Sequence, residues 1–300
     1  MKYSLGTIVR TVFLAMILWC LWQLSWDLNR LQPIRSWWAI TFAILATMIH
    51  SFLGFLRWRS IAIPLKINIG FIDQLEIYIR SITIGQVTPT SIIGDGFRLH
   101  CMKKYPFKTN LYSLILDKLS SHLPWVWVGL IVALLQPSLW TEILAYHGLS
   151  WLFPWILGGF IVGFLGAAFF LCVCKSKVGS KHFFLSFIAL IVFLVNWQLV
   201  LAAFDLDIDV IILLTLFPLL AFFLVLPVSF NGWGIRELGM VWLLTPSGFA
   251  REVILESSIL LGGSQLAGNV VLFVLVIGYK KLSRLSSGNV EKANVSKANS

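Results

Sequence analysis

Apolar runs of about 20 residues, the length needed to cross a bilayer, recur along almost the whole chain. Six are clear, at residues 8–25, 37–56, 111–135, 151–174, 183–204 and 257–279. A membrane-spanning segment must satisfy its own backbone hydrogen bonds, so it is either a helix or part of a closed barrel. The runs are continuous and do not alternate between apolar and polar residues, as barrel strands do. We therefore predict an all-α, polytopic membrane protein with about six spanning helices.

The composition supports this class and argues against nucleic-acid binding. Of the 300 residues, 58% are hydrophobic and 12% are charged, which is far more apolar than a typical soluble domain. The net charge of +10 comes from basic residues divided among short loops between the apolar runs, which is typical of a topology signal. The four cysteines lack the spacing of a zinc site, and we expect neither a metal nor a cofactor.

The loop charges predict the orientation. Lysines and arginines gather on one side, in the loops near residues 57–66, 98–108, 175–181 and 280–284. The opposite loops hold Arg30 and Arg35 but are otherwise acidic, with Glu142 and the segment 205–209. The basic side is expected to be cytoplasmic, which places both termini inside a bacterial-type cytoplasmic (inner) membrane. Residues 1–285 should form a single integral-membrane domain, followed by a disordered cytoplasmic tail at 286–300.

Two further stretches are apolar but interrupted by Gly, Pro and polar residues, at 71–100 and 210–250. Irregular backbone at membrane depth is tolerated where it is buried in protein or lines a wet cavity, and a matching pair of such breaks is typical of a transporter's binding site. By parity the two stretches enter from opposite faces. They are predicted to be opposed re-entrant hairpins in an inverted-repeat-like arrangement. In an alternative arrangement, 210–226 and 238–250 are two additional spans, giving eight.

The first break, GQVTPTSIIGDGFR, has the features of an anion site. A short helix should begin near Ser91, with its free amides and positive dipole end beside the hydroxyls of Thr88 and Thr90. Asp95 and Arg98 follow Gly94 at helical spacing.

The second break, LPVSFNGWGIRE, repeats this pattern. Ser229 and Asn231 supply polar groups, and Arg236 and Glu237 follow two glycines, Gly232 and Gly234. Because arginine can grip a phosphate with two parallel hydrogen bonds, Arg98 and Arg236 together would suit a phosphate-containing headgroup. The alternative is that Asp95 with Arg98, and Arg236 with Glu237, are structural ion pairs.

Other intramembrane polar residues are less specific. Asp117 and Lys118 lie within the third run, where function and snorkelling toward the interface are equally compatible with the pattern. Asn196, Gln198, Gln265 and Asn269 are interpreted as interhelical hydrogen-bonding residues. The sequence has no GK[ST] phosphate loop, GxSxG elbow or HExxH motif, so no catalytic residues are assigned. The nearest match to a metal-binding DxD pair is DLDID at 205–209, which is interpreted as a solvated outer loop, with an outward metal site as the alternative.

The two breaks resemble the two signatures of the integral-membrane flippase region of lysylphosphatidylglycerol synthases and their stand-alone relatives. The layout is similar from about residue 8 to residue 281, including Arg57 after the second run and the pair Asp117 and Lys118 in the third. The resemblance implies a module that moves a lipid or lipid-linked headgroup between leaflets, with these three residues in support. The aminoacyl-transferase domain of the synthases is not in this sequence, so synthesis of lysyl-lipid is not implied.

The favoured hypothesis is a flippase-like transporter for an anionic lipid or a lipid-linked (polyprenyl-phosphate) sugar headgroup, with no nucleic-acid partner. The alternative is a membrane-embedded transferase, or an accessory protein, in cell-envelope glycolipid synthesis. An envelope glycosyltransferase partner and a homo-oligomer are compatible with either hypothesis.

Overall fold

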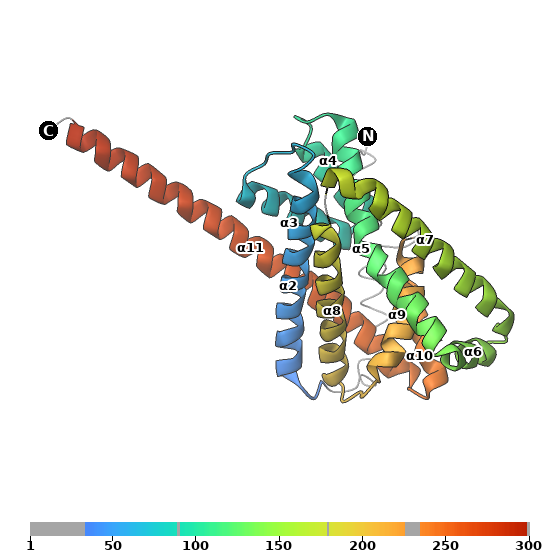
Figure 1. Ribbon diagram of the computed structural model, residues 1–300. Coiled ribbons are helices and arrows are strands. Elements are labelled where there is room, and N and C mark those ends of the chain that lie inside the picture. Colours follow the sequence, from blue (N-terminus) through green and yellow to red (C-terminus); the bar gives the residue numbers. More distant parts are fainter. Residues whose placement is uncertain (1–33, 89–90, 179, 226–234, 299–300) are drawn as a thin grey trace, which may run out of the picture.

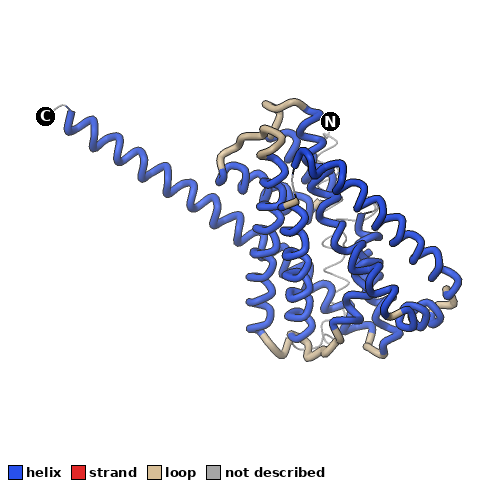
Figure 2. The backbone as a smooth tube through the Cα atoms, viewed as in Figure 1, coloured by secondary structure: helices blue, strands red, loops and turns tan. Residues whose placement is uncertain are grey.

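The computed structural model describes residues 34–88, 91–178, 180–225 and 235–298, and every regular element within these ranges is helical. The helices are α2 (Trp37–Ala62), α3 (Phe71–Val87), α4 (Ser91–Cys101), α5 (Phe107–Leu135), α6 (Pro137–Tyr146), α7 (Phe153–Val178), α8 (Lys181–Ala202), α9 (Val210–Val225), α10 (Ile235–Leu244) and α11 (Arg251–Ala298). Two short 3₁₀ turns, Ser150–Leu152 and Thr245–Ser247, precede α7 and α11. The prediction of an all-α fold is confirmed (Figure 2).

Four of the described helices are long and apolar enough to cross a membrane: α2, α5, α8 and the part of α11 from Arg251 to Ser283. They coincide with four of the six predicted spans. The predicted span at 151–174 corresponds to the 26-residue helix α7, and a shorter apolar helical segment, Ser150–Gly166, covers the preceding 3₁₀ turn and the first part of α7. The predicted span at 8–25 lies outside the described residues. The chain is therefore a polytopic membrane protein.

The long helices form a bundle in which α2 lies beside α8 and α11 crosses α2 and α3 (Figure 1). Two apolar clusters fill its two ends. One surrounds Trp58 and Ile79, where α2 meets α3, and the other surrounds Trp197 and Phe217, where α8 meets α9. Large apolar side chains also remain exposed along α2, α5, α7 and α11. An exposed apolar surface of this extent is expected where the surrounding solvent is lipid.

Two pairs of shorter helices lie at opposite ends of the bundle, α3 with α4 and α9 with α10 (Figure 1). Helices α9 and α10 are separated by residues 226–234, which lie outside the described residues. The choice between a hairpin and two additional spans therefore stays a prediction. That the pairs are re-entrant in a bilayer stays a prediction.

The final helix continues beyond the bundle. We expected a disordered tail from residue 286, whereas α11 continues as a helix to Ala298. Figure 1 shows this part projecting away from the other helices. The placement of the domain boundary near residue 285 stays a prediction.

Candidate functional site

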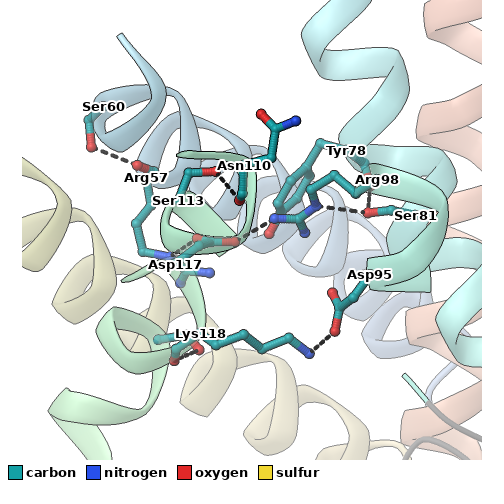
Figure 3. Close-up of polar contacts among 11 residues, drawn as sticks. Arg57, Ser60, Tyr78, Ser81, Asp95, Arg98, Asn110, Ser113, Asp117 and Lys118 are labelled. Atoms are coloured by element: carbon teal, nitrogen blue, oxygen red, sulfur yellow. Dashed lines mark hydrogen bonds and ion pairs between the residues drawn. The ribbon is translucent and has the colours of Figure 1, made fainter. Parts of the chain in front are cut away.

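A buried cluster of three charged side chains joins α2, α4 and α5. Arg57 Nε lies 2.8 Å from Asp117 Oδ1, and Arg98 Nη1 lies 2.8 Å from Asp117 Oδ2. The three residues are each less than a tenth exposed. Figure 3 shows the Asp117 carboxylate between the two guanidinium groups. One carboxylate therefore bridges two arginines from different helices.

Arg98 is held in place by the packing of α4 against α3. A Cβ atom at Gly94 would overlap the backbone oxygen of Ser81, so glycine allows these two helices to approach closely. One turn farther along α4, the guanidinium carbon of Arg98 lies 4.9 Å from the Trp58 ring centroid and 4.8 Å from that of Tyr78. Arg98 Nε also lies 3.4 Å from Ser81 Oγ. Cation–π contacts and hydrogen bonds together fix the direction of this arginine.

A second ion pair lies beside the cluster. Lys118 Nζ is 2.8 Å from Asp95 Oδ2, and the Lys118 side chain is 42% exposed. The structural alternative considered above, in which Asp95 pairs with Arg98, is wrong. Asp95 and Arg98 lie three residues apart on one face of α4, so both reach α5, where Asp117 and Lys118 offer opposite charges.

These charged residues line a cavity of about 310 Å³, whose lining residues come from α2, α3, α4, α5, α8 and α11. The rest of its wall is largely uncharged and polar. Ser51 Oγ donates to Asn269 Oδ1 at 2.5 Å, and Asn269 Nδ2 donates to Gln86 Oε1 at 3.0 Å. Asn196 Nδ2 donates to Thr47 Oγ1 at 3.0 Å. Asn196 and Asn269 thus make the interhelical hydrogen bonds expected of them, and they also face the cavity.

Several lining residues were missed by the sequence analysis, notably Thr47, His50 and Ser51 on α2. Their spacing of three and then one residue places them on one face of the helix, within an otherwise apolar run. That polar stripe was the available signal. Tyr78 and Gln86 on α3 gave no comparable pattern.

The described end of the second break, with Arg236 and Glu237, is not among the described residues that line this cavity. Arg236 Nε is 3.0 Å from Glu237 Oε1 and 3.3 Å from Ser258 Oγ on α11, and both charged residues are buried. Ser229, Asn231, Gly232 and Gly234 lie outside the described residues.

The remaining residues of the first break have simple positions. Thr88 Oγ1 donates to the Ile84 carbonyl oxygen at 2.7 Å, at the end of α3. Ser91 is the first residue of α4, as expected, and Thr90 lies outside the described residues. The structure thus brings together Asp95, Arg98, Arg57, Asp117 and Lys118, on three helices.

Comparison with protein families matches residues 6–182 to the lysylphosphatidylglycerol synthase TM region, which is more than half of the chain. The chain belongs to this family. The matched range includes the first break and all five charged cavity residues, and it ends before the second break, whose resemblance to the family stays a prediction. A search of curated proteins finds no match.

Proposed function

We propose that this protein moves the headgroup of an anionic lipid, or of a lipid-linked sugar phosphate, across the cytoplasmic membrane. One observation carries the proposal: a polar cavity with buried arginines is lined by helices of a membrane domain. Ionisable groups inside a membrane are costly and usually mark a substrate or ion pathway. The acyl or polyprenyl chains would stay in lipid during transfer.

The size of the cavity supports a mechanism in which only the headgroup enters the protein. Its volume of about 310 Å³ is at the lower end of the range for small-molecule pockets, which suits a headgroup and excludes a whole lipid. The two helix pairs, α3–α4 and α9–α10, lie at opposite ends of the bundle (Figure 1). Hairpins that enter from the two faces would allow the cavity to open alternately to each side.

The orientation proposed here places 175–181 and the C-terminal tail in the cytoplasm. Arg35, an exception to the charge rule on the outer side, pairs with Asp205 at 2.8 Å, so its charge is offset locally. A cysteine introduced at Asp207 should react with a membrane-impermeant reagent from outside intact cells. Reaction only from the cytoplasmic side would contradict this orientation.

Reconstitution tests the transport proposal. Purified protein in liposomes should speed the equilibration of headgroups between leaflets for at least one anionic lipid or polyprenyl-phosphate sugar, relative to protein-free liposomes. Arg98→Ala protein, checked for folding by its melting temperature, serves as the matched control. A lipid recovered in chemically altered form would favour the transferase alternative, and unchanged leaflet distributions across the whole panel would contradict transport.

A further inference from the structure

Among the described residues, the ionised side chains that line the cavity leave one uncompensated positive charge. Its lining includes three cations, Arg57, Arg98 and Lys118, and two carboxylates, Asp95 and Asp117. Counting histidines as neutral, three positive charges minus two negative charges give +1. In a low-dielectric site an uncompensated charge is costly, so a ligand with a single negative charge would complete this cavity.

Donor groups remain available for that anion. Arg57 uses Nε and Arg98 uses Nη1 and Nε for contacts with Asp117 and Ser81. The two Nη atoms of Arg57 and Nη2 of Arg98 have no hydrogen-bond partner within the described part of the chain. Guanidinium N–H groups in this arrangement suit the oxygens of a phosphate.

The cavity is also divided along its length into a charged part and a neutral part. On α2, Thr47 and Ser51 precede Arg57 by ten and six residues, or about 15 and 9 Å along the helix axis. On α3 the same order holds, because Ser81 contacts Arg98 whereas Gln86 contacts Asn269. Two independent helices therefore place the neutral amides and hydroxyls on the same side of the charged cluster.

The neutral part presents both donors and acceptors. The Nδ1 atom of His50 lies 2.9 Å from the Ala189 carbonyl oxygen, which can only accept, so Nδ1 carries the proton and Nε2 is an acceptor. Gln265 lines the cavity, and its amide has no partner among the described residues. Mixed donors and acceptors without net charge suit hydroxyl groups, and they provide no carboxylate for an ammonium group.

We propose that the ligand is a phosphodiester with one negative charge and an uncharged, hydroxylated headgroup. Its phosphate would lie at Arg57 and Arg98, and its hydroxyls would lie against His50 and Gln265. This inference rests on the proposed function and specifies its substrate class. A phosphatidylglycerol-type lipid and a polyprenyl-monophosphate sugar share this chemistry, whereas a diphosphate carries too much negative charge and a zwitterionic headgroup adds an unmatched cation.

Paired substrates in the liposome assay test the class and separate its two sources. Polyprenyl-monophosphate hexose is compared with polyprenyl-diphosphate hexose of the same chain, and phosphatidylglycerol with phosphatidylethanolamine. In at least one of these two substrate pairs, we expect the phosphodiester monoanion to equilibrate about tenfold faster or more than its counterpart, because burying an additional unpaired charge is costly. The pair that shows this difference tells whether the natural ligand is a polyprenyl-linked sugar or a phospholipid. Faster movement of the diphosphate or of the zwitterion would overturn the inference while leaving transport intact.

A binding measurement decides the inference even if no lipid moves and the transport proposal fails. In detergent, short-chain phosphatidylglycerol or a soluble monophosphate-linked hexose should raise the melting temperature more than the zwitterionic or diphosphate counterpart. Equal or reversed shifts would contradict the assigned class.

A charge variant provides the sharpest control. Asp95→Asn changes the lining charge from +1 to +2 and should shift the preference toward the diphosphate in both assays. Asp73→Asn also removes one carboxylate, but Asp73 pairs with Lys280 and is not among the described lining residues, so the preference should stay unchanged. An unchanged preference in Asp95→Asn protein, or an equal shift in both variants, would overturn the inference.

Discussion

The helix pairs α3–α4 and α9–α10 each place one arginine after a break that contains glycine, but the two arginines have different surroundings. Arg98 extends from α4 to a carboxylate on α5 and lines the cavity. Arg236 pairs with Glu237, its neighbour in the chain, and contacts Ser258. The difference teaches that similar sequence breaks can place their arginines differently: the Arg98 ion pair joins two helices that line the cavity, whereas the Arg236 ion pair is formed between neighbours on one helix.

The largest expected difference in stability concerns the carboxylates that pair with the two arginines, Asp117 and Glu237. Asp117→Asn removes a carboxylate shared by two buried guanidinium groups, whereas Glu237→Gln removes a carboxylate that pairs with one. Breaking a buried ion pair from one side costs about 3 to 5 kcal/mol, so Asp117→Asn should lower stability by at least that amount and by more than Glu237→Gln. Thermal unfolding in detergent measures both.

A double variant checks the interpretation of the second pair. Removing Arg236 together with Glu237 should recover part of the stability lost by Glu237→Ala alone, because both charges of this buried pair are then absent. Equal losses of stability for Asp117→Asn and Glu237→Gln would show that the ion pairs of Arg98 and Arg236 contribute equally to the fold.

Lysine substitution compares the arginines in function. Lysine keeps the charge and loses the two-pronged geometry, and loss of a charged hydrogen bond costs about 1.5 to 3 kcal/mol. Arg98→Lys should therefore slow transport about tenfold or more while the protein stays folded. Arg236→Lys should affect transport less, since Arg236 is not among the described lining residues. Equal slowing would support the original hypothesis that both arginines grip one headgroup.

The close contact within α3–α4 should be sensitive to a single methyl group. Gly94→Ala would place its Cβ against the Ser81 backbone oxygen, and overpacking of this kind typically costs about 1 to 3 kcal/mol. Gly96→Ala, two residues along the same helix, meets no atom within 4 Å and should be neutral or slightly stabilising. The melting temperatures of the two variants test this difference, and a destabilised Gly96→Ala protein would argue against the described packing of α4 on α3.

The smallest effect on stability is expected for the partly exposed ion pair between Lys118 and Asp95. Lys118 is 42% exposed, so solvent screens its attraction to Asp95. Asp95→Asn should change stability by no more than about 1 kcal/mol, even though it changes the charge of the cavity. Thermal unfolding beside Asp117→Asn measures this, and a comparable loss in both variants would mean that the two ion pairs are equally buried.

The sequence predicted the helical architecture well because run length and apolarity determine which segments can span a membrane. It also located the break containing Arg98, because glycine and proline mark such sites whatever surrounds them. It did not predict that Asp117 bridges two arginines, since partner choice depends on which helices are neighbours in space. The neutral cavity wall was missed for a related reason. Thr47 and Ser51 are weakly polar, and only packing against α8 and α11 shows that they line a common space.

The contact of Arg98 with Trp58 and Tyr78 has a mechanical consequence. Both rings are buried, and the space beside Tyr78 is set by Gly54, where a Cβ atom would meet the tyrosine hydroxyl. A guanidinium confined in this way cannot swing between two faces of a membrane by rotating its own side chain. We therefore expect any displacement of Arg98 to carry α4, which packs closely against α3 at Gly94. The α3–α4 pair should then move as one unit relative to α2 and α5, to which it connects through residues 63–70 and 102–106.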